Sequence, residues 1–164
     1  MLIYNSEISS YFTFHNFINT IFIDALDIDD VIAHLMVSEG FVTIPDIADA
    51  ALDELTNIEG FDEDLASELS NRAKNFVKLE NERVEKSIKK LKVKKDLYDF
   101  ADLTKQNILT LAENGIITLD DLAELDSEEL FNILGKDVFA NEDDAGSIIM
   151  KAREHWFSEI DSEK

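Results

Sequence analysis

The side chains that most often carry catalysis are sparse in this chain and lie far apart. There is no cysteine, so the sequence offers neither a thiolate nucleophile nor a thiolate metal ligand. The three histidines, His15, His34 and His155, are widely separated, and none lies beside a nucleophile and base in sequence. There is no phosphate-binding glycine loop and no HExxH zinc motif. We therefore expect no catalytic residue, no cofactor and no metal, and a protein that is not an enzyme.

Residues 27–32, DIDDVI, bear a superficial likeness to a calcium-binding loop. Such a loop needs a glycine at its sixth position and a glutamate at its twelfth, and this stretch has neither. Carboxylates also favour the first turn of a helix, where they interact with the helix dipole. We interpret the stretch as a helix start.

Residues 52–69, LDELTNIEGFDEDLASEL, follow the pattern of a helix-hairpin-helix module, which grips a nucleic-acid backbone. A short apolar helix leads into Gly60, and a second helix follows at once. Such modules place another glycine two residues later, where backbone N–H groups approach a phosphate. Here that position is Asp62, followed by Glu63 and Asp64. Because carboxylates repel phosphates, the hairpin predicts a scaffold that has lost this contact.

The net charge is −21, and its distribution has three parts. Residues 1–71 hold fifteen acids and no Lys or Arg, residues 72–95 hold ten bases and three acids, and residues 96–164 hold eighteen acids and five bases. The two acidic parts should repel DNA and RNA and attract basic protein surfaces. The alternative is that the acidity serves only solubility.

The chain also repeats itself. Residues 38–60 align without a gap on residues 113–135, and both glycines, Gly40 and Gly60, recur 75 positions later as Gly115 and Gly135. In both copies a threonine, Thr43 or Thr118, precedes an aspartate by three positions, Asp46 or Asp121, which predicts a capped helix start. With a single proline and many strong helix formers, the fold class is all-α. We expect two tandem helix-hairpin-helix (SAM-like) domains of four to five short helices each, joined by a helical basic linker.

Two further segments have helical patterns. Residues 8–23 carry no charged side chain, and five apolar residues there fall on one helical face, which predicts a buried or docking helix: Phe14, Phe17, Ile18, Ile21 and Phe22. Residues 75–97 read as a connector with two i,i+4 Glu–Lys pairs, Glu82–Lys86 and Glu85–Lys89. Its lysines are either a solvated surface or dock against an acidic lobe. Trp156 and Phe157 are expected at the end of the second unit's core.

The paired repeats resemble the C-terminal acidic repeats of the bacterial transcription factor family NusA. The resemblance covers about residues 19–76 and 100–157. It implies four segments: 1–18, unassigned; 19–80, a first acidic repeat; 81–99, a basic helical linker; and 100–160, a second acidic repeat. The polymerase-binding and RNA-binding domains of the family have no counterpart here, so we expect a part of a longer protein.

The resemblance implies a cytoplasmic, non-catalytic module for transcription elongation, termination and antitermination. Its expected partner is the C-terminal domain of the RNA polymerase α subunit, with NusG and a phage antitermination protein as further partners, and with no direct nucleic-acid or membrane contact. From the residues themselves we assign the partner-facing charges to the second repeat: Asp120, Asp121, Glu124, Glu128, Glu129, Asp143 and Asp144.

Two alternatives stay open at this point. One is a nucleic-acid-binding helix-hairpin-helix pair that acts through the basic linker. The other is a purely solubilising tail, in which the same acids only cap helices and keep the chain in solution.

Overall fold

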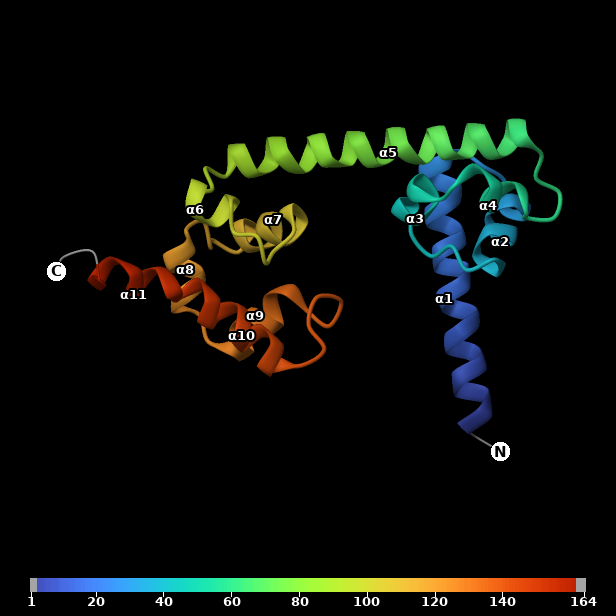
Figure 1. The fold of residues 1–164 in the computed structure, drawn as a ribbon. Helices are drawn as coiled ribbons and strands as arrows, with labels where there is room; N and C mark the ends of the chain where they lie inside the picture. Colours follow the sequence, from blue (N-terminus) through green and yellow to red (C-terminus); the bar gives the residue numbers. More distant parts are fainter. Residues whose placement is uncertain (1–2, 162–164) are drawn as a thin grey trace. The chain divides into compact units, whose positions relative to one another are not determined.

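The structure, a computed structural model, describes the backbone of residues 3–161 and the side chains of residues 13–157. All regular structure within these ranges is α-helical, and the chain divides into two compact units, residues 1–81 and 82–164 (Figure 1). The predicted all-α class with tandem hairpin units is confirmed.

Unit 1 surrounds its core with four helices and the first part of a fifth. These are α1 (Ile3–Leu26), α2 (Asp30–Ser38), α3 (Ile44–Asp49), α4 (Leu52–Thr56) and α5 (Glu63–Lys90). The short helices α2 to α4 gather around one end of α1 (Figure 1). The largest fully buried side chains come from all five helices: Phe22, Leu26, Met36, Ile47, Leu55 and Leu69.

Unit 2 begins with the last turns of α5 and continues with six helices. They are α6 (Lys95–Tyr98), α7 (Lys105–Glu113), α8 (Leu119–Glu124), α9 (Ser127–Leu134), α10 (Glu142–Ala152) and α11 (Glu154–Asp161). Both α8 and α9 pack against α10. The core has its own set of fully buried side chains: Ile88, Leu97, Ile108, Leu111, Leu122 and Leu130.

The repeated sequence forms the same local structure twice. The Thr43 side chain accepts a hydrogen bond from the Asp46 backbone N–H at 3.2 Å, and the Asp46 carboxylate accepts one from the Thr43 N–H at 2.9 Å. Thr118 and Asp121 make the same two bonds at 2.9 and 2.8 Å. Each reciprocal pair satisfies two backbone donors at a helix start, as the i,i+3 spacing predicts.

Glycine ends the helix before each of these starts. Gly40 has φ +96° and Gly115 has φ +88°, and in both turns the next residue's N–H bonds back to a carbonyl in the last helical turn. L side chains rarely adopt this left-handed backbone, whereas glycine does so readily. The turn geometry therefore depends on glycine even though a Cβ there would meet no other atom within 4 Å.

The apolar face that the sequence predicts on α1, for a buried or docking helix, is only partly buried. Ile18 and Phe22 are buried in the unit 1 core, but Phe14 and Phe17 are 51% and 64% exposed. The helix starts at Ile3, so residues that the sequence leaves unassigned are continuous with it. The five residues share one side of a helix, but unit 1 covers only the part of that side that faces α2 and α5.

The connector also differs from expectation. Helix α5 runs on to Lys90, but the Glu85 carboxylate accepts hydrogen bonds from the Tyr98 hydroxyl at 2.8 and 2.9 Å instead of pairing with Lys89. This bond is the main cause that raises the pKa of Tyr98, followed by desolvation. Glu85 thus holds α6 against α5.

The glycine turn can be tested in unit 2 with a matched pair of substitutions. Gly115→Ala should destabilise unit 2 by about 1–2 kcal/mol, because alanine must adopt a left-handed conformation. Gly146→Ala should leave its stability unchanged or raise it by up to about 1 kcal/mol. Gly146 lies inside α10, where an added Cβ would sit 3.5 Å from the Ser127 Cβ, an ordinary contact.

Urea unfolding followed by tryptophan fluorescence measures both variants, because Trp156 is the only tryptophan and lies in unit 2. Equal shifts in the unfolding midpoint for the two variants would contradict this account.

Candidate protein-binding surface

The acids expected to face a partner lie on three short helices of unit 2. Asp120 and Asp121 are in the first turn of α8, and Glu124 is its last residue. The first turn of α9 holds Glu128 and Glu129. The first turn of α10 holds Asp143 and Asp144. Six of these seven acids therefore lie in the first turn of a helix, where a negative charge interacts favourably with the helix dipole.

Three of these carboxylates are occupied by their own backbone. Asp121 accepts from the N–H groups of Ile117 and Thr118 at 2.9 and 2.8 Å. Desolvation raises the pKa of Asp121, but these hydrogen bonds outweigh it, and the net pKa is lowered. Glu129 accepts from the Asp126 N–H at 3.0 Å, and Asp144 from the Ala140 N–H at 3.2 Å. Their first role is capping.

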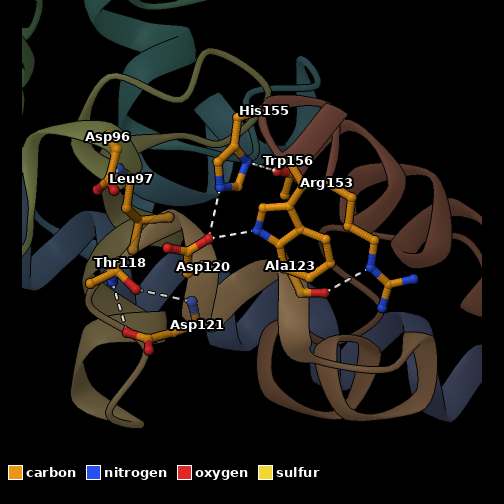
Figure 2. Close-up of polar contacts among 10 residues, drawn as sticks. Asp96, Leu97, Thr118, Asp120, Asp121, Ala123, Arg153, His155 and Trp156 are labelled. Carbon is orange, nitrogen blue, oxygen red and sulfur yellow. Dashed lines mark hydrogen bonds and ion pairs between the residues drawn. The ribbon is translucent and has the colours of Figure 1, made fainter. Parts of the chain in front are cut away.

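Asp120 is held by the end of the chain (Figure 2). Its Oδ1 accepts hydrogen bonds from the Trp156 Nε1 and the His155 Nε2, each at 2.7 Å. The bond from Trp156, followed by that from His155, lowers the pKa of Asp120 below its ordinary value. The other His155 nitrogen, Nδ1, faces the Ala152 carbonyl oxygen. Because both neighbours are acceptors, only the imidazolium form of His155 donates to both.

The remaining three carboxylates are available to a partner. Glu124, Glu128 and Asp143 are exposed, and their side chains make no hydrogen bond or ion pair with the residues that the structure describes. They lie on α8, α9 and α10, one on each helix. Of the seven acids predicted to face a partner, these three carry no internal hydrogen bond to a described residue.

Asp143 lines a groove between the start of α9 and the face of α10. The groove has a volume of about 610 Å³, and Asp126, Gly146 and Met150 also line it. Met150 is 59% exposed. Arg153 lies at one end, but its guanidinium donates to the carbonyl oxygens of Ala123 at 2.8 Å and Leu125 at 3.2 Å. The groove thus combines an exposed apolar side chain with carboxylates.

The acidic turn of unit 1 is also on the surface. Asp62, Glu63 and Asp64 are exposed, and the Asp62 Oδ1 accepts from the Leu65 N–H at 2.8 Å. A backbone N–H at the start of α5, where a helix could bind a phosphate, is thus already bonded to a carboxylate. This geometry agrees with the loss of phosphate contact expected from the sequence.

Two residues of α11 were misplaced by sequence reasoning. Trp156 and Phe157 were expected in the core, but they are 36% and 64% exposed. Trp156 packs instead beside His155, with ring centroids 5.9 Å apart, and is fixed by Asp120. The bond joins residues 36 positions apart in the sequence, and no local pattern indicates it.

Comparisons with known proteins agree with this description. Residues 21–75 match the family model of the SAM-like helix-hairpin-helix tandem. The chain is 38% identical over 135 residues to the transcription termination/antitermination protein NusA of Rickettsia conorii, and equally to that of Rickettsia prowazekii. Over this stretch the chain is similar to NusA. The similarity covers 82% of this chain but 27% of each NusA, so the chain spans about a quarter of the curated relatives' length.

The resemblance to NusA is thus confirmed, and the helix-hairpin-helix assignment with it. Among the described residues, no helix is both long enough and apolar enough to cross a bilayer.

The contact between Asp120 and α11 predicts a pH-dependent contribution to stability. Because the folded-state pKa of Asp120 is lowered from 3.8, its ionised form stabilises unit 2 above that value, and this contribution is lost as the pH falls through the lower folded-state value. Asp120→Asn should therefore destabilise unit 2 at neutral pH, and the difference from the unmodified chain should shrink in acid.

Glu124→Gln is the matched control, because it removes one charge from an exposed carboxylate on the same helix. Thermal unfolding followed by Trp156 fluorescence at neutral and acidic pH compares the two. An Asp120→Asn variant as stable as Glu124→Gln at neutral pH would show that the contact contributes nothing.

Proposed function

We propose that this chain is a non-catalytic protein-docking region of a NusA-type factor in transcription elongation, termination and antitermination. The observation that carries the proposal is the free carboxylate on each of three adjacent helices, in a chain that is 38% identical to NusA over 135 residues. The rest of the NusA polypeptide would supply the remaining activities of such a factor.

The proposed partner is the C-terminal domain of the RNA polymerase α subunit, which the resemblance to NusA implies. Glu124, Glu128 and Asp143 would meet lysine or arginine side chains on that domain. Exposed charge pairs add little affinity individually, but complementary charge raises the association rate and selects a basic partner. Met150, in the groove beside Asp143, offers the apolar contact that a stable interface needs.

Two features favour docking over a purely solubilising tail. Solubility requires charge but no fixed arrangement, whereas these carboxylates project from helices whose starts are held by capping bonds. The groove beside them has a defined apolar and acidic lining. NusG and a phage antitermination protein are further proposed partners, the latter on unit 1, where the Asp62–Asp64 turn is exposed.

The proposal predicts a localised interaction. When the isotopically labelled chain is titrated with the α C-terminal domain from the same organism, amide shifts should concentrate on α8, α9 and α10 and weaken with added salt. The variant Glu124→Gln/Glu128→Gln/Asp143→Asn should weaken binding by about tenfold or more, because three charges that steer and hold a basic face are removed.

The control variant Asp49→Asn/Asp53→Asn/Glu59→Gln makes the same change in net charge with exposed acids of unit 1. It should bind like the unmodified chain. The absence of shifts in residues 100–157 would favour the inert tail, and equal weakening by both variants would indicate that net charge alone drives the association.

A further inference from the structure

The basic segment between the acidic lobes has a surface that protein docking through the acids does not use. Residues 82–95, at the start of unit 2, contain six exposed lysines, of which Lys95 pairs with Asp99. The other five make no such ion pair with the residues that the structure describes: Lys86, Lys89, Lys90, Lys92 and Lys94. We name them the lysine cluster. They are the densest group of positive charge in a chain whose net charge is −21.

The lysine cluster is not neutralised within its unit. No hydrogen bond or ion pair joins any of the five ammonium groups to another side chain in the described part of unit 2. The sequence predicts an ion pair between Glu85 and Lys89. In the structure the Glu85 carboxylate instead accepts hydrogen bonds from the Tyr98 hydroxyl. Helix-dipole stabilisation accounts for Lys89 and Lys90, which lie in the last turn of α5, but not for the others.

The backbone that carries the cluster is fixed. Lys92 has φ +60°, and its N–H and that of Val93 bond back to the carbonyls of Lys89 and Ile88, which closes the end of α5. The Lys94 N–H then donates to the Ile117 carbonyl at 2.8 Å. The chain thus turns sharply after α5, and backbone hydrogen bonds hold the segment that carries the five lysines.

The side chains around the lysine cluster indicate which class of ligand it binds. Between residues 82 and 95 the apolar side chains point inward: Val84 and Ile88 are buried, and Leu91 and Val93 pack against the unit 2 core. A protein interface needs aromatic or aliphatic anchors and is depleted in lysine, and a membrane-binding helix needs an exposed apolar face. A nucleic-acid backbone requires neither, since ammonium groups contact phosphates directly.

The spacing also fits a row of phosphates. At 1.5 Å rise per residue, Lys86 lies roughly 4.5 Å from Lys89 and roughly 6 Å from Lys90 along the helix axis. Flexible four-carbon side chains span the remaining difference from successive phosphates of one strand. The arrangement offers contacts to charge and none to base edges, which corresponds to binding without sequence preference.

We infer that the lysine cluster binds the phosphate backbone of a single nucleic-acid strand, weakly and without sequence preference. This surface shares no residue with the carboxylates of α8 to α10. For this segment the inference takes up the alternative that the sequence leaves open, nucleic-acid binding through the basic linker. The dissociation constant should be on the order of 10⁻⁴–10⁻⁶ M at physiological salt, as for other non-specific contacts.

Fluorescence anisotropy with a labelled 20-nucleotide oligo(U) and the full chain tests the inference. If about five phosphates are contacted, the logarithm of the binding constant falls with the logarithm of salt concentration with a slope of about −3.5. Affinity should thus drop about 100-fold between 50 and 200 mM salt. Lys86→Gln/Lys89→Gln/Lys90→Gln should reduce the slope to about −1.4, since two contacts remain.

The matched control is Lys74→Gln/Lys78→Gln/Lys136→Gln, which removes three exposed lysines outside the cluster. It should keep the full slope. Helical content by circular dichroism verifies that both variants are folded. A chain that leaves the oligo(U) unbound at 50 mM salt, or equal losses in the two variants, would overturn the inference.

Two competition experiments test whether the lysine cluster prefers another kind of polyanion. Displacement of the RNA by poly-glutamate at equal charge concentration would identify the ligand as an acidic protein surface. Binding to phosphatidylserine vesicles in preference to RNA would identify it as a membrane. Because the cluster shares no residue with the proposed docking surface, failure here leaves binding of the α C-terminal domain untouched, and the reverse also holds.

Discussion

The constraint on which this structure depends is the supply of hydrogen-bond acceptors at helix starts. The hairpin units use helices of six to eleven residues, α3, α8, α9 and α10, and each exposes N–H groups in its first turn that have no partner inside the helix. Helices this short are marginal on their own. Carboxylates at the starts accept these bonds and oppose the positive end of the dipole, so part of the acidity is structural.

This constraint divides acids that look equivalent in the sequence. Asp121, Glu129 and Asp144 are engaged by backbone donors, and Asp120 by α11. A carboxylate engaged in this way must lose its internal bond before it meets a lysine on another protein. Exposed carboxylates with no internal bond, such as Glu124, meet a partner without that loss. Charge density alone therefore overestimates how many carboxylates are available for docking. The capping bonds show which of them are already engaged.

Local features of the fold could be predicted from the sequence, and long-range ones could not. Thr43 and Asp46 are three residues apart, so their reciprocal bond follows from helix geometry alone. The bond between Asp120 in α8 and Trp156 in α11 depends on the path of the two helices between them, α9 and α10. The apolar periodicity of α1 predicts a helical face, but Phe17 is exposed because the burial of a face depends on which neighbours reach it. The free carboxylates likewise could not be told from the capping ones without the structure of the helix starts.

The same capping chemistry explains how a hairpin shaped for nucleic acid becomes unsuited to it. At the start of α5, the Leu65 N–H donates to the Asp62 carboxylate, so this donor is not free for a phosphate oxygen. Binding a phosphate there would require displacement of a covalently tethered anion and would also bring a second negative charge beside Glu63 and Asp64. Acid substitution at this turn therefore both completes the helix start and excludes the ligand. Lys89 and Lys90 lie in the last turn of the same helix, where lysines suit the negative end of the helix dipole. The dipole thus places the two signs of charge at opposite ends of one helix.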